Sequence, residues 1–347
     1  MNQFFENIKI ENFKSLRHVE LTDCKRINVF IGKPNVGKSN ILEALSLFSI
    51  THNRLGALNV LDWYIRYENE SELFFNGKIE DGSSTTIASN LANCQLVYQN
   101  LEGLTLDIQA DKIKTQTTIK VGTNDLMVMK HLQPYGQSFR KVKKYIFDYK
   151  RQGQNMRYKR PIGLRLPFLV PPFGSNLVET VEQNDELSAE CIEFFKRYNL
   201  DLVFDKASNA LKIMKATKNG KEGISRIFLL PYSSVADTLQ RIIFYKAAIA
   251  SNKDSILLFE EPEAHAFPPY IVHITQEMIW SKDNQFFLTT HSPFVLNDFL
   301  ENAREDLAVY LVDWKDGETT VKRLSDADLY EIYQYGIDLF TNLETFV

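Results

Sequence analysis

The chain is poor in cysteine: its 347 residues include three, Cys24, Cys94 and Cys191, which lie far apart. Three scattered thiols exclude a disulfide framework and a zinc site built from paired cysteines. The chain also lacks a large excess of charge of either sign, because its net charge is −4. No global field would therefore draw it to nucleic acid or to a membrane. We expect a protein of the reducing cytoplasm.

Long apolar runs are missing as well. A membrane-spanning helix needs about 20 consecutive apolar residues, and the best candidate, residues 242–259, is broken by Lys246 and Lys253. Glu6 and Lys9 stand where a secretory signal would have its apolar centre. We therefore expect a soluble chain with no membrane partner. With 44% hydrophobic residues it can bury a large core.

One short stretch, GKPNVGKSN at residues 32–40, fits the pattern G-x-x-x-x-G-K-[ST] through Gly32, Gly37, Lys38 and Ser39. A β-branched run at residues 26–31 precedes it and predicts a buried strand. Helical spacing follows it in Ile41, Leu42, Leu45 and Phe48. Strand, glycine loop and helix together favour a phosphate-binding loop over a chance glycine turn.

The loop predicts a nucleotide site with assigned roles. Lys38 is expected to reach the β- and γ-phosphates, and the Ser39 hydroxyl to hold Mg²⁺. Backbone N–H groups of the loop are expected to wrap the phosphate chain. The other residues that we include in this cofactor-binding loop are Lys33, Pro34, Asn35, Val36 and Asn40.

Two acidic residues follow a second apolar run, residues 255–259. Carboxylates just beyond the C-terminal end of a buried strand lie where ligands bind in open α/β sheets. We predict that Glu260 faces Mg²⁺ and that Glu261 is the general base, while Pro262 ends the strand. The alternative is a solvated acidic turn.

A third apolar run, residues 285–289, leads into Thr290-His291-Ser292-Pro293. A neutral imidazole at a strand end can donate a hydrogen bond to a γ-phosphate oxygen. His291 is therefore a second candidate catalytic residue, against the alternative of a structural histidine.

Ser234 and Asp237 have the spacing of a capping box ahead of an apolar helix. A helix N-terminus that presents hydroxyl and N–H groups is a candidate second anion site at Ser234. An ordinary capped helix is the alternative reading of the same pattern.

The chain is expected to be α/β, with a P-loop core, an antiparallel β subdomain and an inserted mixed α/β segment. Short β-rich runs at residues 71–125 predict an antiparallel meander, and residue 224 onward predicts a return to parallel strand–helix alternation. We expect residues 1–50 and 221–347 to form the two parts of the core, with residues 51–220 inserted.

A basic stretch at residues 140–160 carries nine Lys and Arg with interleaved aromatic residues. This mixture can grip a nucleic-acid strand by phosphate contacts and stacking. A solvated edge strand protected by lysine is the alternative. The nine basic residues are Arg140, Lys141, Lys143, Lys144, Lys150, Arg151, Arg157, Lys159 and Arg160.

Four stretches together resemble the SMC/RecF-like branch of the ABC ATPases, and especially OLD-type AAA-family ATP-binding proteins. They are IKIENFKSL at residues 8–16, GKPNVGKSN at 32–40, SILLFEEPEAH at 255–265 and LTTHSPFVL at 288–296. The resemblance implies that residues 32–39 are Walker A, Glu260 is Walker B, Glu261 is the catalytic glutamate and His291 is the switch histidine. The family's signature helix would begin near Ser234, although this segment has no signature glycine.

The resemblance also implies ATP and Mg²⁺ as cofactors, hydrolysis to ADP and phosphate, and a nucleotide-linked homodimer or higher oligomer. It further implies control of a separate partner or effector protein, with bacterial anti-phage defence as a setting. Too few residues follow Pro293 for the family's Toprim nuclease domain, so we expect none in this chain. Two alternatives are a RecF-like DNA-binding repair clamp and a nucleotide-binding scaffold with negligible turnover. DNA-stimulated ATPase activity would identify the clamp.

Overall fold

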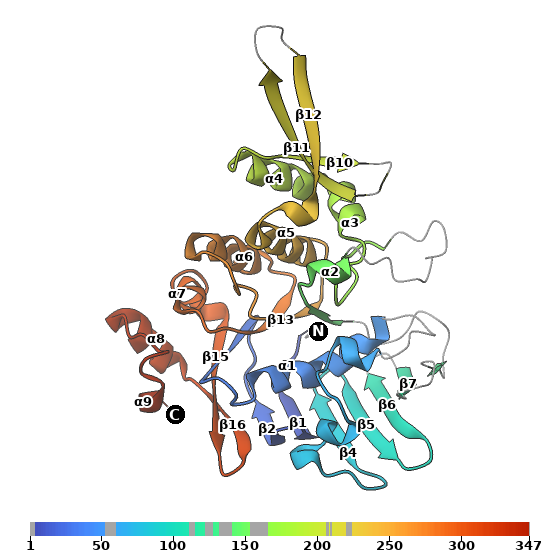
Figure 1. The fold of residues 1–347 in the computed structure, drawn as a ribbon. Helices are drawn as coiled ribbons and strands as arrows, with labels where there is room; N and C mark the ends of the chain where they lie inside the picture. Colours follow the sequence, from blue (N-terminus) through green and yellow to red (C-terminus); the bar gives the residue numbers. More distant parts are fainter. Residues whose placement is uncertain are drawn as a thin grey trace. The chain divides into compact units, whose positions relative to one another are not determined.

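The computed structural model in Figure 1 divides into two compact units. The first contains Met1–Tyr145, Asp254–Glu263 and Met278–Val347, and the second contains Ile146–Lys253 and Ala264–Glu277. The structure describes residues 4–52, 60–110, 115–121, 128–131, 141–152, 166–205, 208, 210–219 and 224–346.

An antiparallel sheet of seven strands forms one layer of the first unit. In β6 every second residue is buried, which is the pattern of a strand with one face on a core. The antiparallel arrangement predicted for residues 71–125 is confirmed for the strands described there. In sheet order the strands are β2 (Leu16–Leu21), β1 (Ile8–Phe13), β4 (Ser84–Ser89), β5 (Asn93–Gln99), β6 (Gly103–Ala110), β7 (Thr115–Val121) and β8 (Val128–His131).

A second sheet of six strands includes the strands that precede the glycine loop, Glu261 and His291. Its strands are parallel except for β16, which is antiparallel to β15. The strands β3 and β14 are buried along their whole length, as the apolar runs predicted. The sheet order is β16 (Glu318–Arg323), β15 (Leu307–Lys315), β3 (Ile27–Ile31), β14 (Gln285–Thr289), β13 (Ile256–Glu260) and β9 (Val142–Tyr145).

One apolar core joins the two sheets of the first unit. It combines side chains of both sheets with those of α1 (Lys38–Ser46), among them Phe30, Ile41, Leu45 and Leu258. The strand β3 and the helix α1, which flank the glycine loop, are therefore packed into the same core. The other helices of this unit are α7 (Pro293–Asn302), α8 (Asp326–Tyr335) and α9 (Leu343–Phe346), with 3₁₀ turns η1 (Leu47–His52), η2 (Leu61–Trp63), η3 (Glu70–Leu73), η4 (Phe75–Gly77) and η7 (Arg304–Asp306).

The second unit contains an antiparallel sheet of three strands with helices around it. The predicted return to a parallel sheet at residue 224 is wrong for the first strand. That strand pairs antiparallel with its predecessor, from Lys212 opposite Pro231 to Asn219 opposite Ile224. The elements are α2 (Tyr149–Gln152), α3 (Leu177–Gln183), α4 (Asp185–Lys196), β10 (Asp201–Asp205), β11 (Ala210–Asn219), β12 (Ile224–Pro231), η6 (Tyr232–Ser234), α5 (Asp237–Ala250) and the start of α6 (Pro268–Trp280).

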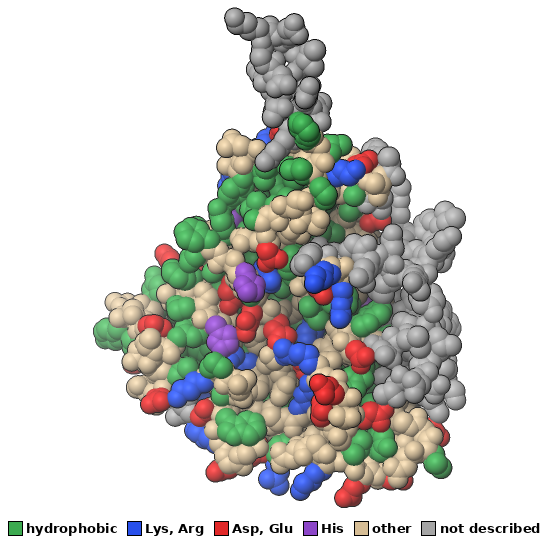
Figure 2. All heavy atoms as spheres, viewed as in Figure 1, with side chains coloured by type: hydrophobic (Ala, Val, Ile, Leu, Met, Phe, Trp, Pro, Cys, Tyr) green, Lys and Arg blue, Asp and Glu red, His purple; other side chains and the backbone are tan. Residues whose placement is uncertain are grey.

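Within the described residues the basic stretch is only partly at the surface, because Lys150 and Arg151 are exposed but Lys143 and Lys144 are buried. Lys143 and Lys144 lie in β9 and are 6% and 1% exposed, because this strand pairs with β13 inside the first unit. Neither a solvated edge nor a nucleic-acid contact fits these two lysines. Arg140 and residues 153–160 lie outside the described residues. On the face in Figure 2, basic and acidic side chains are interspersed rather than gathered into a patch of one sign.

Among the helices that the structure describes, none is both long and apolar enough to cross a membrane.

Candidate nucleotide site

The glycine loop lies between β3 and α1, as the sequence pattern predicted. β3 ends at Ile31, and α1 begins at Lys38 with Gly37 as its N-cap residue at φ 100°. No side chain caps this helix N-terminus. Its first N–H groups therefore face the loop, where they can bind an anion.

Both motif glycines are required by close packing. A Cβ atom on Gly32 would lie 2.1 Å from the carbonyl oxygen of Val312. A Cβ atom on Gly37 would lie 2.1 Å from Thr319 Oγ1 and 2.7 Å from Ser15 Oγ. The loop is therefore pressed against β15, β16 and the turn between β1 and β2, which fixes its shape.

Lys38 folds back over the loop. Its ammonium group donates hydrogen bonds to the carbonyl oxygens of Gly32, at 2.9 Å, and Lys33, at 2.8 Å. Burial lowers the pKa of Lys38, and the nearby Glu261 carboxylate acts in the opposite direction. A phosphate group in the loop would offer this cation a full negative charge in place of two neutral carbonyl groups.

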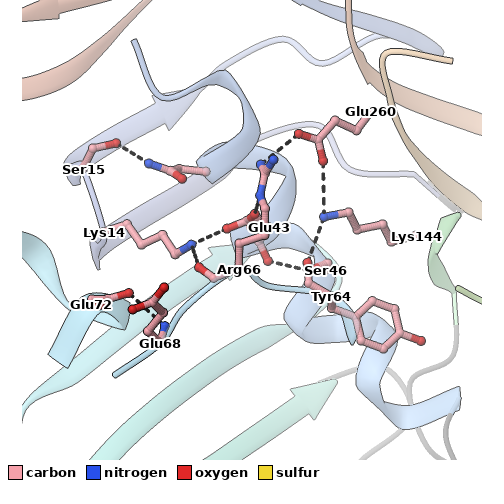
Figure 3. Close-up of polar contacts among 11 residues, drawn as sticks. Lys14, Ser15, Glu43, Ser46, Tyr64, Arg66, Glu68, Glu72, Lys144 and Glu260 are labelled. Atoms are coloured by element: carbon pink, nitrogen blue, oxygen red, sulfur yellow. Dashed lines mark hydrogen bonds and ion pairs between the residues drawn. The ribbon is translucent and has the colours of Figure 1, made fainter. Parts of the chain in front are cut away.

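Ser39 and Glu260 meet at the start of α1 and the end of β13. The Ser39 hydroxyl lies close enough to the Glu260 carboxylate to lower the pKa of that carboxylate. Burial raises the pKa of Glu260, but Lys144, Ser39 and Arg66 together outweigh burial and lower the pKa. Glu260 is therefore an ionised, partly buried carboxylate, and Figure 3 shows it between Arg66 and Lys144.

Glu261 and His291 also lie together. His291 Nε2 is 3.4 Å from Glu261 Oε1, and both side chains are about two-fifths exposed, at 40% and 41%. The backbone of Glu261 has a φ of 41°, and its N–H group donates to the carbonyl oxygen of Thr289 at 3.1 Å. Burial lowers the pKa of His291, and the Lys38 charge lowers it further. The imidazole is therefore neutral at pH 7.

Glu263 is a residue to which the sequence analysis assigned no role. Its Oε1 atom accepts hydrogen bonds from Thr290 Oγ1, at 2.5 Å, and from the backbone N–H group of His291, at 3.2 Å. Burial raises the pKa of Glu263 despite these bonds. Glu263 thus joins the chain after β13 to the chain after β14 and positions His291 beside Glu261.

The other residues of the predicted loop make structural contacts. Lys33 is exposed and pairs with Glu344 at 2.8 Å, and Val36 is buried. The Asn40 amide donates to Ser15 Oγ at 2.7 Å, so this side chain supports the loop from outside. The remaining exposed residues of the loop are Pro34 and Asn35.

The expected capping box at Ser234 is wrong. Ser234 ends a 3₁₀ turn, and the next two residues are extended, so α5 begins at Asp237 with Ala236 as its N-cap and no side-chain cap. The extended residues move Ser234 too far from the helix to accept from its first N–H groups. Ser234 is exposed and belongs to the second unit, whereas the glycine loop belongs to the first.

The structure thus brings Lys38, Ser39, Glu260, Glu261 and His291 together at the C-terminal edge of three neighbouring strands, β3, β14 and β13. Sequence reasoning did not find Arg66 and Lys144, which contact Glu260. Lys144 lies in the basic stretch, for which both interpretations placed the side chains at the surface. No sequence pattern marks Arg66.

The oxygen donors present fit Mg²⁺. Within the described residues, no group of three or more His, Cys, Asp or Glu side chains could hold a metal ion by itself. Mg²⁺ is commonly bound by one or two carboxylates, phosphate oxygens and water. One ionised carboxylate, Glu260, close to one hydroxyl, Ser39, at the start of the helix that follows the glycine loop matches that donor set.

Family models match two parts of the chain. The AAA ATPase domain matches residues 4–127. The family described as "AAA domain, putative AbiEii toxin, Type IV TA system" matches residues 179–297. The two matches cover the glycine loop and the acidic strand end, respectively.

Curated proteins are similar at low identity. An ATP/GTP phosphatase of Helicobacter pylori is 22% identical over 326 residues, which cover 83% of this chain and 85% of that protein. Uncharacterized protein MJECL10 of Methanocaldococcus jannaschii is 30% identical over 119 residues, or 31% of this chain. The DNA replication and repair protein RecF of Leptospira biflexa is 37% identical over 76 residues, or 20% of this chain. The matched regions span 54% of the Methanocaldococcus protein and 21% of RecF.

Among solved structures, the SmcHead bound to the C-winged helix domain of ScpA resembles this fold. The match covers 95% of this chain and 100% of that chain, with a TM-score of 0.52 and 14% identity. This likeness confirms the predicted fold class, a P-loop ATPase core with an antiparallel β subdomain.

Proposed function

Because the chain belongs to the SMC/RecF-like AAA ATPases, we propose that it binds ATP with Mg²⁺ and hydrolyses ATP to ADP and phosphate. The observation that carries this proposal is the meeting of Lys38 and Ser39 with Glu260, Glu261 and His291. A phosphate-binding loop alone binds nucleotide, but turnover also needs a residue that orients or deprotonates water.

In this proposal the backbone of residues 32–39 wraps the phosphate chain, and Lys38 exchanges its two carbonyl contacts for phosphate oxygens. Ser39 and Glu260 would hold Mg²⁺, and the ion would supply positive charge beside the phosphates. Glu261 takes a proton from the attacking water. The neutral His291 donates a hydrogen bond toward the terminal phosphate, and Glu263 keeps its backbone in place.

The wild-type protein should release phosphate from ATP with Mg²⁺ and show no release above background with EDTA. The Mg²⁺ requirement follows from the charges at the site, because the Glu260 carboxylate and the phosphate groups are all negative and repel one another unless a cation lies between them. Phosphate release and binding of a fluorescent ATP analogue would be measured on the same preparation. Absence of binding at millimolar nucleotide would reject the nucleotide site. Binding without turnover would favour a nucleotide-binding scaffold.

We propose further that ATP promotes a homodimer that controls a separate effector protein, with anti-phage defence as the setting. The family model that includes AbiEii toxins supports an effector system. ATP would favour a closed dimer only through contacts that its γ-phosphate makes across the interface. The exposed segment at Ser234 and the uncapped start of α5 form the candidate trans contact.

Sedimentation of the Glu261→Gln variant should therefore show a dimer with ATP and a monomer with ADP or without nucleotide. The additional substitution Ser234→Arg should abolish the ATP-dependent dimer without changing the unfolding temperature, because Ser234 is exposed. A mass that does not respond to nucleotide would contradict the ATP-dependent dimer. An unchanged dimer in the Ser234→Arg variant would remove this segment from the interface.

A further inference from the structure

Two cations of the chain contact the carboxylate that we assign to the metal. Arg66 Nη2 lies 2.9 Å from Glu260 Oε1, and Lys144 Nζ lies 3.8 Å from Glu260 Oε2 (Figure 3). Each oxygen of Glu260 therefore faces a positive charge. A metal ion that used this carboxylate would have to share it with these cations or displace one of them.

The two cations differ in how firmly they are held. Lys144 has a side chain that is 2% exposed, lies in β9 beside β13, and donates to the carbonyl oxygen of Tyr64 at 2.9 Å. Arg66 has a side chain that is 68% exposed and follows the 3₁₀ turn η2 rather than lying in a strand. Lys144 is thus a fixed counter-ion, and Arg66 is the one that can leave.

Arg66 also has a second anchor away from Glu260. Its Nε atom donates to Glu43 Oε1 at 2.7 Å. Glu43 lies on α1, is 1% exposed and also accepts from Lys14 Nζ at 2.5 Å. The Lys14 ammonium donates to the carbonyl oxygen of Arg66 as well. These contacts retain the arginine at its Nε end when its Nη2 end leaves Glu260.

We propose that Arg66 is an internal counter-ion that competes with Mg²⁺ for Glu260 and thereby sets the Mg²⁺ concentration that nucleotide binding requires. This inference rests on the proposed ATP site. Without metal, the guanidinium group adds to the charge of Lys144 in neutralising Glu260 and so reduces the repulsion between this carboxylate and phosphate. When the metal binds, the same oxygen has to turn from Arg66 to Mg²⁺, and the lost ion pair opposes metal binding. Arg66 therefore acts as a positioning residue, through Glu260.

The test is a Mg²⁺ titration of binding of a fluorescent ATP analogue, with Arg66→Met beside the wild type. Methionine keeps an aliphatic side chain and removes the charge. The half-saturating Mg²⁺ concentration should fall about two- to fivefold, the size expected for an exposed ion pair. Affinity in EDTA should fall, because Glu260 then keeps only Lys144 as a counter-ion and repels the nucleotide more strongly. Arg197→Met is the matched control, because Arg197 is 61% exposed and pairs with Glu193 at 3.3 Å in the second unit.

A double-mutant cycle decides whether Arg66 acts through Glu260. In a Glu260→Gln background the Arg66→Met shift in Mg²⁺ requirement should disappear. The same shift in that background, or an unchanged Mg²⁺ midpoint in Arg66→Met, would overturn the inference while leaving the ATP site intact. Absence of nucleotide binding by the wild type would overturn both the inference and the proposed function.

Discussion

Replacing Glu261 with glutamine should lower ATP turnover by about 10²- to 10⁴-fold, the usual contribution of a general base, and leave ATP affinity nearly unchanged. Glutamine has the same shape but cannot accept the proton. Glu261 lies beside His291 and is held by a backbone hydrogen bond to Thr289, so the substitution should not disturb the loop that binds phosphate. Single-turnover hydrolysis and equilibrium binding of ATP would measure the two effects separately.

Lys38→Ala is the contrasting control. Lys38 contacts the loop itself and would contact the phosphate charge of bound ATP before the reaction. Its removal should therefore weaken ATP binding, and not only slow the hydrolysis of bound ATP. Charge-assisted hydrogen bonds contribute about 1.5–3 kcal/mol each, so affinity should fall by at least about tenfold. Equal losses of nucleotide affinity in both variants would contradict the roles assigned to these two residues.

The parts of the site that the sequence predicted are those encoded by local patterns. A buried strand, a glycine loop and a helix are consecutive in the chain, and the structure has them as β3, residues 32–37 and α1. Glu260, Glu261 and His291 lie at or just after the ends of apolar runs that form parallel strands of the same sheet, β13 and β14. Because parallel strands end at one edge of the sheet, Glu261 and His291 meet although they are 30 positions apart in the sequence.

The contacts that the sequence did not predict depend on long-range pairing. Lys143 and Lys144 follow one another, which suggests that at least one is solvated, yet both are buried in β9 beside β13. The Glu260 carboxylate at 3.8 Å and the Tyr64 carbonyl oxygen at 2.9 Å compensate the buried ammonium group of Lys144. Arg66 lies in irregular chain, and its partners Glu43 and Glu260 are distant in sequence. The predicted capping box at Ser234 was wrong because two residues, Val235 and Ala236, separate Ser234 from the start of α5.

Replacing Gly37 with alanine should destabilise the first unit by about 2–5 kcal/mol and abolish measurable ATP binding. The backbone there has a φ of 100°, which costs an alanine about 1–2 kcal/mol. The new methyl group would also lie 2.1 Å from Thr319 Oγ1 and 2.7 Å from Ser15 Oγ, and overpacking costs about 1–3 kcal/mol. Those hydroxyl groups bond to one another at 2.7 Å, so relief of the clash would have to move the loop or break their bond.

Gly82→Ala separates backbone strain from this clash. Gly82 has a similar φ of 85°, but a Cβ atom there would have no neighbour within 4 Å. This control should lose only the backbone contribution, about 1–2 kcal/mol, and bind ATP as the wild type does. Thermal unfolding and ATP binding would be measured on both variants. If Gly37→Ala matched Gly82→Ala in both measurements, the loop would not need its tight contact with β16, and its shape would have to come from the glycine backbone alone.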